Sequence, residues 1–489
     1  MMSPAQSAAR ASDFAGNSAA SAASNTTDPT ERNMARYLTL LATVLLAGGL
    51  PGCNQSWKVV YPRGLSAGAI VPCGRVSYST PLELFAGGKY LVAGEDFAHY
   101  AVDLDTGTAA PGPSGRVVAV SPNGLVVFDE TFSWAKGRCV PPSRQMNLWD
   151  LSDRPPRLVR SWSVGPRDWD WQCAFSSDGK QLAFMKYGEV WVCNAADGSS
   201  ARRLTEEAAS PLAFSPDGTI LACLMRLAEN RRSVVALWNV AEGRLLRTPN
   251  PIAGHNQAVL EAVVFSADGQ TLVVRHSYIL PPPPPDLDPL GLTYEIVPKT
   301  ETVVYAVDSG DELLRTSGNA AVTGDRRFLI DCCDKPDPTG AGLAVYDLST
   351  AREARRLRAG WPGALAQGTS LYAARGANYS AEDRKSEIGL WDLATGAQVR
   401  SLPPVEDWWD CTALSPDGRL VVLSTVCRMR VADFTTGRTV LEVYKPPRGE
   451  TGVYIGHRAV FSPDGKHLVF NVGSQGFIVN LDAIRAAGD

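Results

Sequence analysis

The sequence predicts an all-β fold in which one four-stranded unit repeats along most of the chain. Three observations indicate it: a turn tetrapeptide recurs, short apolar strands flank each turn, and a Trp-Asp pair ends the third strand of several units. Four short antiparallel strands that repeat every 40 to 55 residues are typical of a β-propeller. We therefore expect a single β-propeller of four-stranded antiparallel blades, with eight blades, and with seven or nine as the alternatives.

The turn tetrapeptide is Ser-Pro-Asp-Gly or a near variant, and it links the first and second strands of each unit. Proline presets the backbone of the second turn position, and glycine accepts the positive φ that the turn requires. The aspartates should hydrogen-bond to nearby amides of their own turns. The tetrapeptides begin at residues 121, 176, 215, 266, 415 and 462, and the turn aspartates are Asp178, Asp217, Asp268, Asp417 and Asp464.

Three further units are degenerate. The interval between the turns at 266 and 415 spans about three periods, so two units should lie inside it. Segments 323–330 (TGDRRFLI) and 367–374 (QGTSLYAA) have the right pattern, and so has 86–94 (AGGKYLVAG) near the start. The sequence thus contains nine candidate units, and because several are weak we expect a ring of eight.

The third strands end in a recurrent pair, in the segments 147–150 (NLWD), 236–239 (ALWN), 344–347 (AVYD) and 389–392 (GLWD). One blade cannot bury both of its faces, whereas a closed ring buries them and removes the sheet edges. We expect segment 57–61 (WKVVY) to close the ring by pairing with the last blade.

These units resemble WD-repeat proteins, and equally the Asp-Gly turn repeats of bacterial periplasmic propellers such as that of the Tol–Pal system. The resemblance covers the chain from about residue 80 onward and implies a propeller that binds partners on one face. The Gly-His pair of WD repeats is well placed once, at Gly254 and His255. The resemblance implies a structural bond between His255 and Asp268.

The N-terminal region differs from the rest in composition. Residues 1–33 are rich in Ala and Ser and should be disordered. Residues 34–52 have the pattern of a signal peptide, with a basic start and an apolar run too short for a typical membrane span. The run ends in Leu-Pro-Gly-Cys53, which resembles the lipobox of bacterial lipoproteins and implies a lipid on Cys53. A plain secretory signal and an uncleaved anchor are the alternatives, and Met34 is an alternative start.

These features predict the domain organisation and the location. Residues 53–80 should form a linker that includes the ring-closing strand, and residues 81–489 the propeller, with a proline-rich insertion at 276–300. We expect an exported, monomeric lipoprotein that faces the periplasm or the cell exterior. It would contact the membrane through its lipid anchor only.

Composition and motifs exclude several function classes. The net charge is −4 with a pI near 5.9, and because no basic block appears, we expect no nucleic-acid partner. Nine cysteines remain besides Cys53, without a C-x-x-C spacing and mostly in apolar strand patterns, and their pairing is left open. Nucleophile-elbow, zinc-protease, phosphate-loop and dinucleotide motifs are absent from the sequence. We therefore predict no catalytic residues, no metal and no cofactor.

Two aromatic–acidic segments stand directly before an inner strand. Exposed tryptophan beside carboxylate suits recognition of a peptide or a sugar. The alternative is that these indoles pack between neighbouring blades, with one of Trp408 and Trp409 buried. The candidate partner-binding residues are Asp168, Trp169, Asp170, Trp171, Asp407, Trp408, Trp409 and Asp410.

The sequence as a whole favours a non-enzymatic propeller scaffold that binds a protein or a cell-envelope component. The alternatives are a propeller enzyme, either a glycan lyase or hydrolase or a quinoprotein, and a structural assembly factor of the envelope. An enzyme predicts ionisable groups that converge in the central channel. A scaffold predicts a broad aromatic face.

Overall fold

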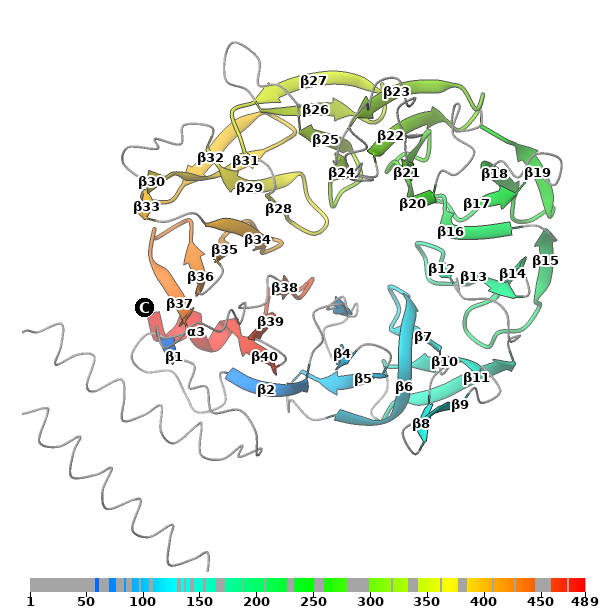
Figure 1. The fold of residues 1–489 in the computed structure, drawn as a ribbon, viewed down its shortest axis with the longest axis horizontal. Helices are drawn as coiled ribbons and strands as arrows, with labels where there is room; N and C mark the ends of the chain where they lie inside the picture. Colours follow the sequence, from blue (N-terminus) through cyan, green and yellow to red (C-terminus); the bar gives the residue numbers. More distant parts are fainter. Residues whose placement is uncertain are drawn as a thin grey trace, which may run out of the picture.

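The computed structural model of the chain is a ring of antiparallel sheets around a common centre (Figure 1). It describes residues 58–488 with gaps, of which the longest are 61–69, 164–171, 250–258, 279–298, 333–341, 377–384 and 445–458. The described residues contain eight sheets of four or more strands, and their helix is α3 (Leu481–Gly488). The prediction of a single all-β propeller with four-stranded antiparallel blades is confirmed.

Five sheets consist of four strands each in chain order. Their strands are β12 (Cys173–Phe175), β13 (Gln181–Lys186), β14 (Glu189–Asn194) and β15 (Arg202–Thr205); β16 (Ala208–Phe214), β17 (Ile220–Arg226), β18 (Ser233–Asn239) and β19 (Arg244–Arg247); β20 (Val259–Phe265), β21 (Thr271–Tyr278), β22 (Lys299–Ala306) and β23 (Glu312–Ser317); β24 (Ala320–Val322), β25 (Phe328–Cys332), β26 (Leu343–Asp347) and β27 (Arg352–Leu357); β28 (Ala364–Leu365), β29 (Leu371–Arg375), β31 (Ile388–Asp392) and β32 (Ala397–Ser401). The degenerate turns near 323 and 367 lie between β24 and β25 and between β28 and β29, where the repeat predicted them.

A seven-stranded sheet joins two units through one long strand. It contains β3 (Glu83–Leu84), β4 (Tyr90–Glu95), β5 (Ala98–Asp103), β6 (Ala109–Val120), β7 (Leu125–Asp129), β10 (Gln145–Asp150) and β11 (Arg157–Ser163). The first part of β6 pairs with β5 and the last part with β7, so β6 ends one unit and begins the next. The nine candidate units of the sequence therefore occupy eight sheets.

The last two sheets each include a strand from the N-terminal part of the chain. They contain β34 (Asp410–Leu414), β35 (Leu420–Ser424), β36 (Arg428–Asp433) and β37 (Thr439–Tyr444) with β1 (Lys58–Val60), and β38 (Ala459–Phe461), β39 (His467–Val472) and β40 (Gln475–Asn480) with β2 (Ile70–Arg75). Two short two-stranded sheets stand apart from the ring sheets: β8 (Ser133–Ala135) with β9 (Arg138–Val140), and β30 (Lys385–Ser386) with β33 (Val405–Glu406).

The ring closes through β2 and not through the segment predicted from the sequence. β2 pairs with β40 and completes the last sheet, whereas β1 pairs with β37 at the outer edge of the preceding sheet. The prediction that 57–61 pairs with the last blade is therefore wrong. The physical reason is order along the chain: β2 directly precedes the first unit, and β1 is left to cover the next open sheet edge.

The recurrent turns are held by side chains as well as by backbone. In the SPDG turn at 215, the Ser215 hydroxyl donates to an Asp217 carboxylate oxygen at 2.5 Å. The same hydroxyl accepts from the amide of Ile220 at 2.9 Å, and Asp217 accepts from the amide of Thr219 at 3.1 Å. Asp178, Asp268, Asp417 and Asp464 make the corresponding bonds. These aspartates therefore satisfy donors of their own turns.

The turn at 323 keeps this pattern with different residues. Thr323 donates to Asp325 at 2.6 Å and accepts from the amide of Phe328 at 3.0 Å. Arg326 occupies the place of the glycine and has a φ of 57°. An L-residue with a side chain is strained in this region, so this turn is less stable than its neighbours.

Neighbouring units contact one another through the turns and through their apolar faces. The side-chain amide of Asn123 donates to the backbone carbonyl of Asp178 at 2.8 Å. The backbone amide of Ala267 donates to the backbone carbonyl of Arg326 at 3.0 Å. Arginines on fourth strands reach the next unit: Arg160, Arg202 and Arg355 donate to the carbonyls of Asp197, Ala241 and Ala394. The core lies between adjacent sheets, as in the cluster of Leu224, Val235, Leu272, Val303 and Tyr305.

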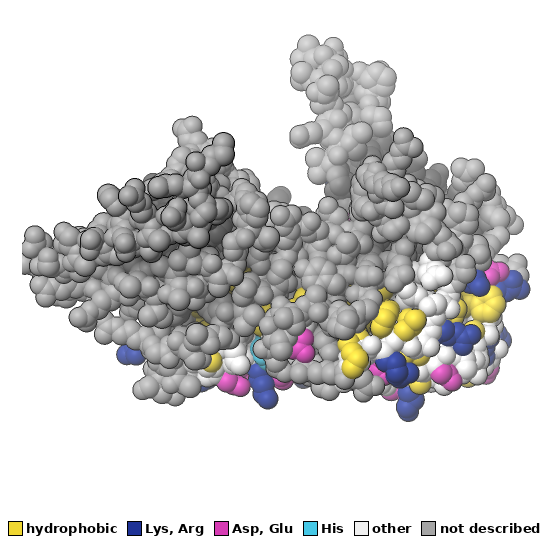
Figure 2. All heavy atoms as spheres, turned by 90° about the horizontal axis from the view of Figure 1, so that it is seen from below, with side chains coloured by type: hydrophobic (Ala, Val, Ile, Leu, Met, Phe, Trp, Pro, Cys, Tyr) yellow, Lys and Arg dark blue, Asp and Glu magenta, His cyan; other side chains and the backbone are white. Residues whose placement is uncertain are grey.

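Strand direction divides the ring into two faces. We call the face that carries the Ser-x-Asp-Gly turns the turn face, and the opposite one the loop face. Connections from second to third strands, and from fourth strands to the next unit, leave from the loop face because the strands are antiparallel. The strand ends that flank the long connections 164–172, 248–258, 279–298, 333–342 and 445–458 all lie on it. In the edge-on view of Figure 2 the described side chains mix both charges with polar and apolar groups.

Candidate functional site

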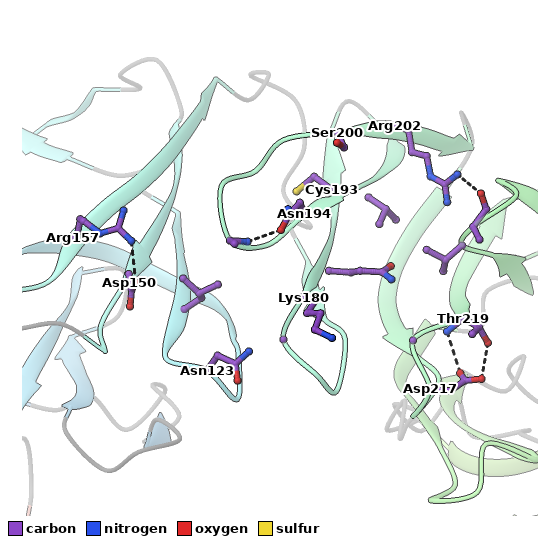
Figure 3. A pocket seen from close by; sticks show the side chains of 18 residues that line it. Asn123, Asp150, Arg157, Lys180, Cys193, Asn194, Ser200, Arg202, Asp217 and Thr219 are labelled. Carbon is purple, nitrogen blue, oxygen red and sulfur yellow. Dashed lines mark hydrogen bonds and ion pairs between the residues drawn. The ribbon is translucent and has the colours of Figure 1, made fainter.

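A cleft of about 850 Å³ opens beside the turns of three consecutive units (Figure 3). Its lining comes from the ends of β10 and β11, from β13 and β14, and from the turns that follow β16 and β18. The charged lining residues are Asp150, Arg157, Lys180, Arg202 and Asp217. The cleft lies where the short, hydrogen-bonded turns fix the backbone, so its walls are preformed.

The charged side chains of this cleft bond to one another, to neighbouring side chains or to the backbone. Asp150 accepts from Arg157 at 3.1 Å and from the Ser152 hydroxyl at 2.5 Å. Burial opposes ionisation of Asp150, but the Ser152 and Arg157 bonds outweigh it and hold its pKa below the usual value. The Ser215 hydroxyl likewise lowers the pKa of Asp217. Both carboxylates therefore stay ionised at neutral pH and act as hydrogen-bond acceptors.

Buried thiols contribute no chemistry to this site. Cys193, which lines the cleft, is a free thiol whose pKa burial raises to about 12. Cys223 and Cys411 are also free, and burial raises the pKa of each to about 12. A protonated thiol is a poor nucleophile and a poor metal ligand. Within the part of the chain that the structure describes, no group of three or more His, Cys, Asp or Glu residues could hold a metal ion.

The innermost strands of seven units are β12, β16, β20, β24, β28, β34 and β38, and β3 and the last part of β6 hold the same position in the other two units (Figure 1). Their partly exposed side chains are mostly small and apolar, among them Ala174, Ala213, Ala262, Val264, Val322, Leu365 and Val460. The acids on these seven strands are Glu261 and Asp410. Glu261 accepts from Arg275 at 2.6 Å, and Asp410 lies 3.8 Å from Arg375. Each acid thus faces an arginine of its own and not the other acid.

The structure places only part of the two aromatic–acidic segments. Asp168, Trp169, Asp170, Trp171, Asp407 and Trp408 lie outside the described residues, as do Cys53 and His255. Trp409 is 1% exposed and belongs to the apolar cluster with Leu402, Cys411 and Phe434. Trp409 is therefore the buried member of the pair, as the alternative of packing between blades has it, and its indole offers no open surface to a partner. Trp409 packs between two sheets because it lies on the same side of its strand as Cys411, which faces the core.

Trp409 nevertheless borders a second, smaller opening of about 370 Å³. The guanidinium of Arg430 lies over the indole, 5.0 Å from the ring centroid, and donates to Glu442 at 3.3 Å. Arg428 and segment 402–405 complete the wall. We call this opening the Trp409 groove. Sequence reasoning missed Arg430, although two arginines at alternate positions of β36 were a usable signal.

A cluster of ionisable side chains surrounds Glu301 at the root of the proline-rich insertion. Glu301 accepts from the Tyr278 hydroxyl at 2.8 Å and from Arg315 at 2.7 Å, and it lies 3.4 Å from the buried His276. Burial opposes ionisation of Glu301, but the bonds from Tyr278 and Arg315 prevail and lower its pKa. Arg315 also pairs with Glu312 at 2.6 Å. This cluster holds the strand ends from which residues 279–298 depart.

Comparisons with known proteins give distant likenesses only. No family model matches the chain, and no curated protein matches it. Among solved structures, one described as the crystal structure of the eukaryotic initiation factor is 14% identical, covers 80% of this chain and 94% of its own, and has a TM-score of 0.49. Dipeptidyl peptidase 4 of Porphyromonas gingivalis is 12% identical over 75% of this chain and 60% of its own, with a TM-score of 0.47. Hydrazine synthase of Kuenenia stuttgartiensis is 14% identical over 82% of this chain and 99% of its own, with a TM-score of 0.37. We infer nothing about function from likenesses this distant.

The described residues were also compared with the requirements of a membrane span. Among them, no helix is both long enough and apolar enough to cross a bilayer.

Proposed function

We propose that this chain is a non-enzymatic, WD-repeat-like propeller scaffold that is exported and lipid-anchored through Cys53. It binds a protein or another cell-envelope component with its loop face. The observation that carries the proposal is the division of the ring into two unlike faces. Short bonded turns form the turn face, whereas the long connections all leave from the loop face. Loops that vary in length on a rigid scaffold are where binding residues concentrate.

The described side chains of the innermost strands favour a scaffold over an enzyme. The described side chains of the innermost strands are mostly small and apolar, and Glu261 and Asp410 each face an arginine. General acid–base catalysis needs a titratable side chain that is positioned to exchange a proton with the substrate. Glu261 and Asp410 instead each resemble one member of a structural ion pair. The segments 168–171 and 407–408 belong to connections that lead into inner strands, so the untested Asp and Trp residues there stay candidates for binding.

The strand pairing near the N-terminus supports an anchor on the loop face. Lys58 pairs with Tyr444, the last residue of β37, at the end of that strand which leads to the loop face. Cys53 precedes Lys58 by five residues. Such a segment spans at most about 17 Å. A lipid on Cys53 would therefore hold the rim of the loop face near the membrane, where a membrane-associated partner is within reach.

The test of partner binding replaces the longest insertion. Tyr278 and Lys299 are Cα partners at the ends of β21 and β22, so residues 279–298 can be exchanged for a two-residue Asn-Gly turn. Cross-linking in intact cells should then lose at least one protein that the wild type captures. The variant Arg356→Gln, on the outer strand β27 and outside both openings, is the control and should keep it. An unchanged set of cross-linked proteins after the exchange would argue against binding through this insertion.

The anchor has its own test. A palmitate analogue should label the wild type and leave Cys53→Ala unlabelled. Persistent labelling of Cys53→Ala would refute lipidation at Cys53, without affecting the partner experiment.

A further inference from the structure

We propose that the outer edge of β27 binds an extended acidic segment of a partner protein, which adds to this sheet as a fifth strand. β27 is the last strand of its four-stranded sheet and lies on the outside of the ring (Figure 1). Among the described strands, none pairs with its outer edge. Such an edge presents unpaired backbone N–H and C=O groups, which are the groups that bind an added strand. This contact lies outside the loop face and goes beyond the function proposed above.

The sheet of β34–β37 shows that an outer edge of this ring accepts a fifth strand. β1 pairs there, antiparallel, with residues 442–444 of β37. These residues follow the irregularity in the pairing of β36 with β37, which lies between Thr439 and Leu441. β27 has the same irregularity in its pairing with β26, between Glu353 and Arg355. Residues 356–358 therefore hold the place on this sheet that 442–444 hold on the other.

Proline distinguishes this edge from two comparable ones. β19 ends at Arg247 and Pro249 follows two residues later, and β32 ends at Ser401 and Pro403 follows two residues later. Proline has no N–H to donate and interrupts pairing along a strand. Residues 352–360 contain no proline. The backbone beyond the irregularity of β27 can therefore pair with an added strand.

The arginines of β27 and of the residue that follows it are engaged to different extents. Arg356 pairs with Glu353 at 2.8 Å. Arg355 donates to the backbone carbonyl of Ala394, an acceptor without formal charge. Residues 352–358 (REARRLR) contain four arginines and one glutamate, so their formal charge is +3. The edge is therefore strongly basic, although the whole chain has a net charge of −4.

Arg352 and Arg358 carry the charge that a partner can use. Both side chains are exposed, and they lie at opposite ends of the edge. Neither side chain makes an ion pair or a hydrogen bond within the part of the chain that the structure describes. Asp347 is the Cα partner of Arg352, and its carboxylate accepts from the amide and the hydroxyl of Ser349 instead. An acid of an added strand would therefore pair with either arginine without displacing an existing partner.

The same charges argue against a second copy of this chain as the occupant. Two copies that paired edge to edge would bring arginines opposite one another, and like charges in that position destabilise strand pairing. Charged edge strands prevent self-association in this way. An acidic segment meets opposite charges at the same edge, so the arginines favour that partner and reject a copy. The occupant is therefore an acidic segment of another protein.

The experiment selects peptides from a random nonapeptide library displayed on phage, with the purified full chain as bait. Acidic peptides without proline in their central residues should be enriched, and a fluorescein-labelled copy of the most enriched one should bind the wild type. The bound peptide should slow backbone hydrogen exchange within residues 352–358, as measured by mass spectrometry. Failure to enrich acidic peptides, or slower exchange only elsewhere in the chain, would overturn the proposal.

Backbone methylation tests strand addition directly. Only alternate N–H groups of a strand point toward its neighbour in an antiparallel pair. Two copies of the peptide, N-methylated at odd or at even positions, should therefore differ: one should bind about ten-fold or more weakly, and the other should keep most of its affinity. Equal affinities of the two copies would show that side chains alone hold the peptide, and would refute a fifth strand.

Two variants connect the peptide with the basic edge. Arg352→Gln and Arg358→Gln should each weaken binding several-fold, and the double variant should weaken it about ten-fold, as expected for two exposed ion pairs. Neither substitution removes a bond of the folded chain, so the midpoint of urea unfolding should not change. Arg244→Gln is the matched control, an exposed arginine of the outer strand β19 that pairs with Glu242 at 3.0 Å, and should leave peptide binding unchanged.

The outcomes separate this edge from other sites and from a membrane. Equal affinity of the wild type and the double variant would place the peptide elsewhere and overturn the proposal. Binding of the full chain to phosphatidylglycerol vesicles that falls in the double variant, while acidic peptides bind neither protein, would assign the edge to a membrane surface and also overturn it. The results for the 279–298 exchange and for Cys53→Ala are independent of both.

Discussion

The hydroxyl of Ser215 should be the most sensitive polar group of its turn. Ser215 is 3% exposed, donates to Asp217 and accepts from the amide of Ile220. In Ser215→Ala the Ile220 amide is left buried without its side-chain acceptor, and a charge-assisted bond to Asp217 is lost. An unsatisfied buried donor costs about 1–3 kcal/mol, so we expect the free energy of unfolding to fall by about 2 kcal/mol.

The chain itself supplies the control for this substitution. Thr323 makes the corresponding bonds in its own turn, so Ser215→Thr should keep most of the stability. Urea unfolding followed by circular dichroism gives the midpoint and slope of each variant. A midpoint for Ser215→Ala equal to that of the wild type, or an equal loss for Ala and Thr, would refute the reasoning.

The same bond predicts a pH dependence. The Ser215 hydroxyl lowers the pKa of Asp217 below the ordinary 3.8. A carboxyl with a depressed folded pKa contributes stability that is complete above its unfolded pKa and is lost as the pH falls through its folded pKa. The difference between the wild type and Ser215→Ala should therefore be constant from neutral pH down to about 5, and should shrink at more acidic pH.

Three further predictions concern the backbone, the ring closure and the thiols. Arg326→Gly should raise the midpoint of urea unfolding slightly, because it relieves a φ of 57°; a lower midpoint would show that the side chain contributes more than the strain costs. Deleting 70–75 should lower the thermal midpoint far more than deleting 58–60, since the former removes the fourth strand of a sheet and the latter a fifth; equal effects would show that closure through β2 is dispensable. Cys411 should react with iodoacetamide at pH 8 much more slowly in the folded chain than in urea, because burial raises its pKa to about 12, and equal rates would contradict this burial.

Sequence reasoning predicted the fold because the repeat is written in short-range chemistry. A typical turn carries a hydroxyl, a carboxylate and a glycine within four residues, and these are visible without any tertiary information. The degenerate turn at 323 was recognisable because Thr323 and Asp325 keep the polar pair even though Arg326 replaces glycine. The closing strand was misassigned because pairing between β2 and β40 joins opposite ends of the chain, and no local pattern specifies which edge is filled first.

The site was harder to predict, because its geometry depends on register between strands. Trp409 and Arg430 are separated in sequence by the whole of β35, and the pairing of β34 with β35 and of β35 with β36 brings them together. From the sequence, Trp409 was one of two adjacent indoles with equal claim to the surface. The alternation of β34 decides between them only once the core side of Cys411 is known.

The burial of Trp409 changes what the aromatic–acidic segment can do. An indole in the open binds by its exposed face, whereas this one is covered by a guanidinium 5.0 Å from its ring. The indole therefore acts as a packing residue between the two sheets, and together with Glu442 it holds the guanidinium of Arg430 in place.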